Sequence, residues 1–460
     1  MTLANVNRDN FGKLFTLPVD GAYLESVPIA GKGSHNVIYV ATMHDSVYAF
    51  DADSNNGPNA SPLWQTSLLA PGATAVPMSI QRCQGVTEWT EVGVVSTPVI
   101  DAATGTLYAV AKTYENGDTI FRLHALDVKS GKEKLGGPVP LAATYTINGQ
   151  TETFNAFAET NRPALLLTNG HVYMAFGSNG CNDFAVQGWV LSYNASTLAL
   201  EGAFSTEPGR ALASIWQKGG GLSADSAFNV YAETGEGNFA PGTNFGSSIL
   251  KFRQSDARLE LADWFTPYNQ AYLSAHDLDL NNSVLVLPDQ PGKHPHLAIG
   301  VGKEGTLYVL DRDDMGQYCS ICTTKDTQIV QELLFAVGRQ TGSLVYWNST
   351  VYSTGTGSPI MAWPLTNGVL PPTPAVQTEN QVGAHSPVIT SNGSTNGILW
   401  QINGGSLTAY DAKTLGKLYS SSDTDGRDTL PPLAHFASLI VVSGKVYVST
   451  NSGVVVLGQL

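Results

Sequence analysis

Short apolar segments alternate along the whole chain with turns rich in Gly, Asn and Ser. The segment Gly302–Asp311 is typical, because a turn bounded by two glycines leads into a strand-like run that ends on an Asp. Runs of this length between turn residues predict β-strands. The same cadence recurs from one end of the sequence to the other, which indicates a repeat protein.

Eight copies of one unit can be followed. Each copy contains an apolar strand, a strand ending in small residues, an Ala-apolar-Asp strand and a short fourth strand, all separated by turns. The copies are marked by Val37–Ala41, Gly105–Ala109, His171–Ala175, Asn229–Ala232, Thr306–Asp311, Thr350–Ser353, Gly397–Trp400 and Ser438–Val441. A period of about 40–60 residues per unit is typical of the four-stranded blades of a β-propeller.

The two ends of the chain complement each other. The eighth copy, Ser438–Leu457, ends after three strands, whereas Gly12–Leu17 precedes the first copy and has the pattern of a fourth strand. We therefore predict an all-β, eight-bladed propeller of four-stranded antiparallel blades, with residues 1–460 as a single domain. The N-terminal strand would complete the last blade and protect the sheet edges. An open array of hairpins or two stacked sandwiches is the alternative.

Composition limits the partners. Apolar residues make up 42% of the chain and charged residues 13%, so a large core can form, and the net charge of −14 disfavours nucleic acid and anionic membranes. No window of 18 apolar residues predicts a membrane span. The segment Met1–Asn5 lacks the features of a signal peptide. We expect a secreted or periplasmic protein whose signal is not in this sequence, with a cytoplasmic protein as the alternative.

Four cysteines stand at positions 83, 181, 319 and 322. The pair Cys319 and Cys322 is compatible with a redox pair, half of a zinc site or a loop disulfide. A second Cys pair, an HxxxH motif and a surrounding βαβ pattern are all missing from the sequence. These observations favour a loop disulfide.

The run Gly219–Gly221 has the composition of a phosphate-binding loop, but no helix pattern and no Lys-Ser/Thr follow it. We expect glycine there because the backbone packs closely near the propeller axis.

The repeat has a family resemblance. An Ala-apolar-Asp triplet followed by Gly-Lys resembles the blade motif of the quinoprotein alcohol dehydrogenases, and it is clearest at Ala125–Asp127 with Gly131-Lys132 and at Ala409–Asp411 with Gly416-Lys417. The resemblance covers nearly the whole chain. It implies an eight-bladed propeller with an axial funnel, which in those enzymes holds pyrroloquinoline quinone (PQQ), a Ca²⁺ or lanthanide ion and a catalytic Asp. The repeat alone does not imply a cofactor, because non-enzymatic assembly-factor propellers also carry it.

The resemblance can be carried over residue by residue to a metal site. Asp183 falls where the family has a metal-binding Glu, and Asn238 matches a metal-binding Asn, with Glu236 adding a carboxylate two positions earlier. Asp279 is the third expected oxygen ligand. Hard cations such as Ca²⁺ prefer several oxygen ligands, some of them charged.

The catalytic positions follow in the next copy. The stretch His276–Asp279 resembles the one that carries the catalytic Asp, and it leaves both Asp277 and Asp279 as candidates. Lys303 matches the basic residue that contacts the quinone oxygens. Without a cation, carboxylates crowded into one funnel would repel one another, and the pKa of at least one of them would rise. They would then form a general acid–base pair beside Lys303.

Several departures from the family argue against a bound quinone. Ala224 stands where the quinone would stack on a Trp, no pair of adjacent cysteines exists, and the Arg that begins blade two is missing from Glu91–Val94. Cys83 and Cys181 lie in two loops that could approach each other at the rim, and a disulfide between them is a hypothesis.

Three functions are compatible with the sequence. The first is an enzyme that transforms a small molecule in the funnel by carboxylate and lysine chemistry, with or without a metal. The second is a PQQ- and Ca²⁺-dependent alcohol or sugar dehydrogenase, and the third is a non-catalytic scaffold.

Overall fold

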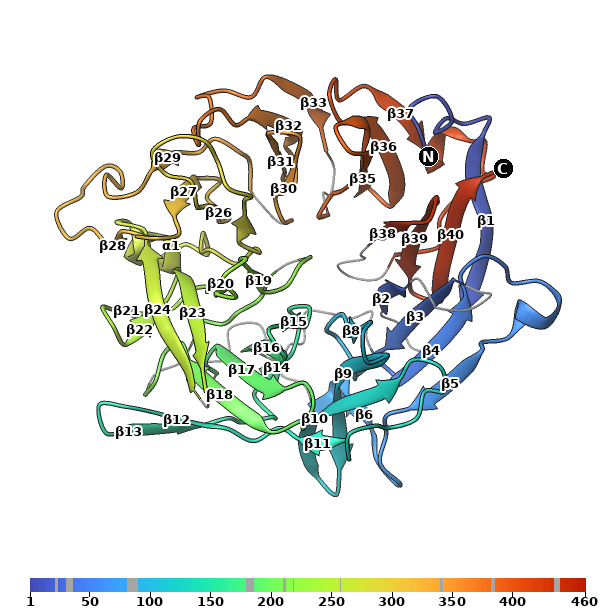
Figure 1. Ribbon diagram of the computed structural model, residues 1–460, viewed down its shortest axis with the longest axis horizontal. Coiled ribbons are helices and arrows are strands. Elements are labelled where there is room, and N and C mark those ends of the chain that lie inside the picture. Colours follow the sequence, from blue (N-terminus) through green and yellow to red (C-terminus); the bar gives the residue numbers. More distant parts are fainter. Residues whose placement is uncertain are drawn as a thin grey trace.

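In the computed structural model, eight four-stranded antiparallel sheets are arranged around a central axis (Figure 1). The structure describes residues 1–20, 36–80, 90–178, 186–209, 212–217, 219–256, 258–339, 342–381, 385–433 and 439–460, and only the backbone of residues 24–29. The predicted eight-bladed propeller is confirmed.

The blades follow one another in chain order, and each runs from an inner strand to an outer one. Blades one to four consist of β2 (Leu24–Ile29), β3 (Val37–Thr42), β4 (Ser46–Asp51) and β5 (Trp64–Ser67); β8 (Val99–Asp101), β9 (Thr106–Glu115), β10 (Asp118–Asp127) and β11 (Val139–Pro140); β15 (Leu166–Thr168), β16 (His171–Ser178), β17 (Trp189–Asn194) and β18 (Leu200–Ser205); and β19 (Ser223–Ala224), β20 (Val230–Glu233), β23 (Ile249–Ser255) and β24 (Arg258–Thr266).

Blades five to eight have the same order. They consist of β25 (Leu285–Val286), β26 (Leu297–Val301), β27 (Leu307–Asp311) and β29 (Gln331–Leu333); β30 (Val345–Trp347), β31 (Thr350–Thr354), β32 (Pro359–Pro364) and β33 (Val376–Asn380); β34 (Val388–Asn392), β35 (Thr395–Asn403), β36 (Ser406–Asp411) and β37 (Lys417–Ser420); and β38 (Leu439–Val442), β39 (Lys445–Thr450), β40 (Gly453–Gln459) and β1 (Phe11–Pro18).

Smaller elements decorate this ring. The repeat pattern did not predict them, because they lie in the connections between blade strands. They are β6 (Thr74–Pro77), β7 (Glu91–Val92), β12 (Thr144–Ile147), β13 (Gln150–Thr153), β14 (Glu159–Thr160), β21 (Phe239–Ala240), β22 (Asn244–Phe245), β28 (Gln317–Tyr318), the helix α1 (Gln270–Ala275) and three 3₁₀ turns, Gly57–Ala60, Met78–Ile80 and Ser421–Asp423. No helix in the described residues is long and apolar enough to cross a membrane.

The ring closes where the two ends of the chain meet. Strand β1 pairs antiparallel with β40, and Leu17 lies opposite Val454 (Figure 1). The fully buried Asp428 carboxylate accepts hydrogen bonds from the backbone N–H of Lys13 at 2.9 Å and from the Tyr419 hydroxyl at 2.8 Å. The predicted closure by the N-terminal strand is therefore confirmed.

Two local predictions are also confirmed. Cys319 and Cys322 form a disulfide, whereas Cys83 and Cys181 lie outside the described residues. Close packing explains the glycine run at the axis, because a Cβ on Gly220 would lie 2.8 Å from the Ser343 hydroxyl and one on Gly221 would lie 2.7 Å from the Ala164 carbonyl oxygen.

The topology places certain loops together. In each blade, the connection between the second and third strands lies on the same face of the ring as the connection from the fourth strand to the next blade. We call this face the site face. Residues of blades four, five and six that are distant in sequence meet on it.

Candidate functional site

A cluster of charged side chains lies on the site face around the boundary of blades four and five. Glu236 comes from the loop after β20, Asp277 and Asp279 from the loop after α1, Lys303 from the turn between β26 and β27, and Arg339 from the connection after β29. We call these five residues the charged cluster.

Lys303 is the centre of the cluster. Its ammonium group donates hydrogen bonds to Asp279 Oδ1 at 2.7 Å and to Asp277 Oδ1, and Arg339 donates to Asp277 Oδ2 at 2.9 Å. The backbone N–H of Lys303 also donates to the Asp279 carbonyl oxygen at 3.0 Å. Gly302 permits this approach, since a Cβ there would lie 2.8 Å from the same carbonyl oxygen.

Asp279 is fully buried, and its second oxygen, Oδ2, receives no hydrogen bond from the described N–H and O–H groups. Burial raises the pKa of Asp279 to about 7, helped by the charge of Glu236 and by a proton that the two carboxylates can share, and opposed by Lys303. Desolvation and a neighbouring like charge both favour the protonated acid. Burial and the neighbouring Glu236 carboxylate thus favour a protonated Asp279 more than in an exposed aspartate.

The pKa values of Asp277 and Lys303 shift in the directions that favour their charged forms. Burial alone would raise the pKa of Asp277, but Lys303 and Arg339 outweigh it and lower that pKa. Burial alone would lower the pKa of Lys303, but Asp279 and Asp277 raise it. Asp277 is 62% exposed, so the cluster extends from a buried carboxylate to solvent. Two carboxylates with opposite pKa shifts are suited to different roles.

The donor set of the cluster fits a hard cation. Glu236, Asp277 and Asp279 each offer a carboxylate oxygen, and these oxygens lie within 4.8 Å of one another. Lys303 already occupies one oxygen of Asp277 and one of Asp279, which leaves Asp279 Oδ2 and the Glu236 carboxylate for a metal ion. Ca²⁺ binds carboxylate groups of this kind together with water.

A second buried acid, Glu233, connects two of the segments that carry the charged cluster. Glu233, the last residue of β20, accepts hydrogen bonds from the backbone N–H of Asn282 at 2.8 Å and of Val301 at 3.2 Å. Burial raises its pKa to about 8, although these two hydrogen bonds act in the opposite direction. Glu233 thus ties the segment after Asp279 to the strand that leads to Lys303.

A cavity of about 410 Å³ adjoins the cluster at Lys303. Its wall contains Tyr268, Asn269, Tyr272, Leu278, Lys303, Glu304 and Phe335. Tyr272 and Phe335 are 52% and 68% exposed, and although the Tyr272 ring stacks on His276, both side chains offer apolar surface to a bound molecule. We call this cavity the aromatic pocket.

The structure brings together four of the residues singled out from the sequence, which are Glu236, Asp277, Asp279 and Lys303. The side chain of Asn238 has a different partner, because its amide donates a hydrogen bond to Glu207 Oε1 at 2.5 Å. Asp183 lies outside the described residues.

Ala224 is in a different part of the molecule. It pairs with Val230, the first residue of β20, whereas Glu236 follows the last residue of that strand. Ala224 therefore lies toward the face opposite the charged cluster, where it lines the central channel.

Sequence reasoning missed several neighbours of the cluster. A Cβ on Gly235 would lie 2.9 Å from Asp279 Oδ2 and 3.3 Å from Trp216 Cδ1, so an indole and the buried carboxylate flank the same glycine. The guanidinium of Arg162 lies 5.8 Å from the centre of the Trp216 ring. An aromatic residue three positions before the glycine run was the available signal for Trp216. Neither Arg162 nor Arg339 stands in a motif that could have been recognised.

Comparison with known proteins bears on the fold. No family model and no curated protein matches the sequence. The structure matches quinohemoprotein alcohol dehydrogenase from Comamonas testosteroni with a TM-score of 0.63 and 14% identity, over 100% of this chain and 77% of that one. The chain shares the fold of the quinoprotein dehydrogenases. A europium-containing methanol dehydrogenase matches with a TM-score of 0.57 and 15% identity over 98% of this chain and 87% of that one.

The same fold also occurs outside that group. BamB from Moraxella catarrhalis matches with a TM-score of 0.59 and 13% identity, over 98% of this chain and all of that one. The predicted resemblance is thus confirmed for the fold, and the chemistry has to be argued from the residues of the site.

Proposed function

We propose that this protein binds a small molecule at the charged cluster and transforms it by proton transfer, with Asp279 as the general acid–base. Lys303 holds the carboxylate in place and, with Arg339, stabilises negative charge on the reacting molecule. The observation that carries this proposal is the environment of Asp279, a buried carboxylate with one oxygen bonded to Lys303 and the other without a donor in the part of the chain that the structure describes. A general base works best when its pKa is near the working pH.

The aromatic pocket is the proposed substrate site. Lys303 belongs both to its wall and to the cluster, so a molecule held against Tyr272 and Phe335 would place a polar group beside the charged side chains. Sites for small molecules combine an apolar wall with a few polar groups in this way. The proposal includes a secreted or periplasmic location, where such a molecule would be met outside the cytoplasm.

A metal ion is an alternative use of the same oxygens, in which Asp279 would be a ligand in place of the general acid–base. Glu236 and Asp279 Oδ2 would hold it, because they are the carboxylate oxygens that Lys303 leaves available. A bound Ca²⁺ would supply Lewis-acid polarisation of a substrate oxygen. Lys303 and Arg339 would then keep Asp277 ionised at the solvent edge.

A PQQ-dependent alcohol or sugar dehydrogenase is the second candidate. The shared fold and the contact between Lys303 and Asp279 favour it. The side chain at the expected stacking position does not fit a quinone, because Ala224 has no aromatic face and lies toward the opposite face of the ring. Added PQQ and Ca²⁺ that produce a new absorption band and dye reduction with alcohols would establish this candidate instead.

Untargeted mass spectrometry tests the main proposal. The protein is incubated with a mixture of metabolites, in parallel with Asp279→Asn and with the control Asp313→Asn, whose carboxylate lies in an exposed turn and pairs with His296. We expect at least one metabolite to be converted by the wild type and the control and to remain unchanged with Asp279→Asn. Conversion at equal rates by all three proteins, or by none across mixtures of alcohols, sugars, esters and organic acids, would contradict the proposal and favour a non-catalytic scaffold.

A further inference from the structure

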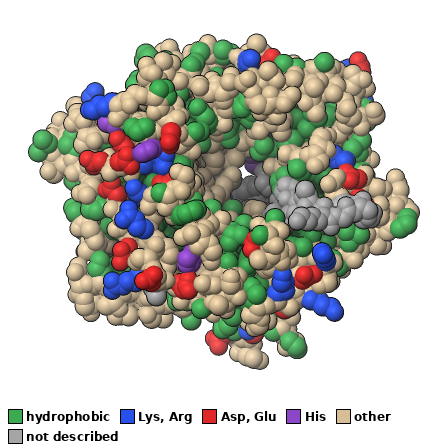
Figure 2. All heavy atoms as spheres, viewed as in Figure 1, with side chains coloured by type: hydrophobic (Ala, Val, Ile, Leu, Met, Phe, Trp, Pro, Cys, Tyr) green, Lys and Arg blue, Asp and Glu red, His purple; other side chains and the backbone are tan. Residues whose placement is uncertain are grey.

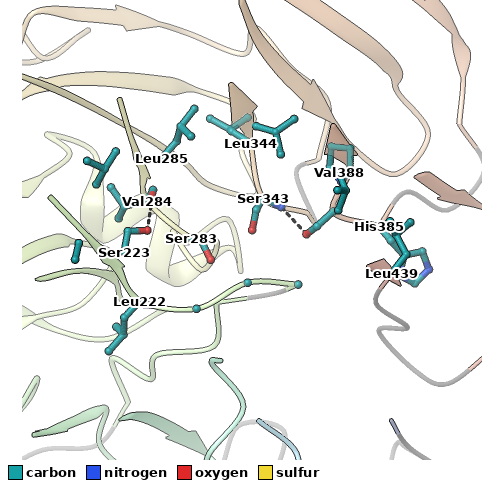
Figure 3. A pocket seen from close by; sticks show the side chains of 18 residues that line it. Leu222, Ser223, Ser283, Val284, Leu285, Ser343, Leu344, His385, Val388 and Leu439 are labelled. Atoms are coloured by element: carbon teal, nitrogen blue, oxygen red, sulfur yellow. Dashed lines mark hydrogen bonds between the residues drawn. The ribbon is translucent and has the colours of Figure 1, made fainter. Parts of the chain in front are cut away.

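A second cavity lies at the hub of the propeller, separate from the charged cluster and the aromatic pocket. It has a volume of about 450 Å³ and is lined by the inner strands of blades four to eight and the residues that precede them (Figure 3). The space-filling view shows the molecule hollowed at its centre (Figure 2). We call this cavity the hub channel.

Serines form one end of the channel. Ser283, Ser343 and Ser386 each stand two residues before the inner strand of their blade, so equivalent positions of blades five, six and seven carry a hydroxyl. These positions lie at the site-face end of the strands. The glycine run approaches both Ser283 and Ser343, since a Cβ on Gly220 would lie against both hydroxyls.

One of these hydroxyls has unused hydrogen-bonding capacity. The Ser283 hydroxyl is buried and has no hydrogen-bond partner among the described residues. Its neighbours are engaged, since Ser386 accepts a hydrogen bond from the backbone N–H of Ser343 at 2.9 Å and Ser223 donates to the Val284 carbonyl oxygen at 2.5 Å (Figure 3). A buried polar atom without a partner is uncommon unless it binds water or a ligand.

Apart from Ser223 and His385, the other described residues of the channel wall are glycine or aliphatic. Leucine, valine and alanine side chains follow the serines along each inner strand toward the opposite face, among them Leu285, Leu344, Val388 and Ala224, and Leu439 lies across the cavity beside His385. Among the described residues that line the channel, none is Asp, Glu, Lys or Arg, and His385 is the one with an ionisable side chain. Apart from the His385 ring, an ion would find no described partner of opposite charge there and would lose its hydration.

We infer that the hub channel is a binding site for an uncharged molecule with an aliphatic body and one hydroxyl or carbonyl group, which bonds to Ser283. Its volume is within the range of small-molecule pockets, about 300–1,000 Å³. The inference does not depend on the chemistry of the charged cluster, because the two sites share no residue.

Saturation-transfer NMR with 1-octanol tests this inference on the intact protein, with octanoate as a charged probe of the same chain length. We expect 1-octanol to bind the wild type and octanoate to bind at least tenfold more weakly. Ser283→Ala should weaken 1-octanol binding about five- to tenfold, since it removes one hydrogen bond. The control Ser196→Ala changes an exposed turn residue and should bind like the wild type. Asp279→Asn should also bind like the wild type, which separates this site from the proposed catalytic one.

The second variant fills the channel with a larger side chain. Ala224→Phe places a ring in the cavity and should abolish saturation transfer from 1-octanol. If that variant does not fold, Ser283→Ala decides the question, because removal of an unpartnered buried hydroxyl is tolerated. No binding of 1-octanol to the wild type, equal binding to Ser283→Ala, or equal binding of octanoate would each overturn the inference.

Discussion

Lys303 Nζ lies 2.7 Å from Asp279 Oδ1, and the contact joins the turn between β26 and β27 of blade five to the loop that enters that blade. Both side chains are buried, and the second oxygen of the carboxylate has no donor among the described residues. The pair therefore combines a structural contact between two loops with an acid whose protonation is sensitive to its surroundings.

Loss of the lysine charge should be costly. Lys303→Met leaves Asp279 buried without its cation, and we expect a loss of about 3 kcal/mol in the free energy of unfolding, because an unpaired buried charge is strongly unfavourable. Chemical denaturation measures this change in the free energy of unfolding. The double variant Lys303→Met/Asp279→Asn should recover much of the loss. The matched control is Lys417→Met, whose exposed ion pair with Asp423 should contribute less than about 1 kcal/mol. Equal losses in the single and double variants would show that the pair does not interact.

Calcium should stabilise the protein through the free carboxylate oxygens. We expect added Ca²⁺ to raise the melting temperature of the wild type, because an ion that binds only the folded state stabilises it. Glu236→Gln and Asp279→Asn should each abolish the effect, and Asp313→Asn, outside the cluster, should retain it. A calcium effect of the same size in all four proteins would assign the ion to another place.

The pH dependence of stability should reveal Glu233. Its pKa in the folded protein, about 8, is above the ordinary value of 4.5, so the folded state holds this proton more tightly than the unfolded state. The resulting stabilisation is complete below pH ~4.5 and is lost as the pH rises through 8. Between pH 5 and 9 the melting temperature of the wild type should therefore fall more steeply than that of Glu233→Gln. The exposed Glu379→Gln should follow the wild type, and parallel curves for all three proteins would contradict the shifted pKa.

Packing at the axis should tolerate no side chain on Gly220. Gly220→Ala places a Cβ against the Ser283 and Ser343 hydroxyls, and overpacking of this kind costs about 1–3 kcal/mol. Gly416→Ala is the control, because its Cβ would meet only the Thr414 hydroxyl, at 3.3 Å. Thermal unfolding of both variants measures the difference. A melting temperature for Gly220→Ala equal to that of Gly416→Ala would mean that the hub adapts.

The sequence was sufficient for the ring because the repeat is local. Strand periodicity and turn residues such as Asn116-Gly117, both with positive φ in the hairpin between β9 and β10, act within single blades. Because the last repeat lacks a fourth strand of its own, closure of the ring by β1 could also be predicted. The contact of Asp279 with Lys303 was predictable only through family resemblance, because the two residues stand on different loops.

The rest of the site depends on three-dimensional contacts that no local pattern encodes. Arg339 reaches Asp277 from the connection after blade five, and Trp216 approaches Asp279 only across Gly235. Asn238 matched a metal ligand in sequence, yet its amide bonds to Glu207, a residue of the connection after blade three. A one-dimensional motif could not distinguish these partners.

The central claim is that Asp279 exchanges a proton near neutral pH. Carbon-13 NMR of protein labelled at the aspartate side-chain carboxyls, with Asp279→Asn for assignment, measures it directly. The account predicts that the Asp279 signal titrates with a midpoint near 7. A midpoint near the ordinary aspartate value of ~3.9 would contradict it.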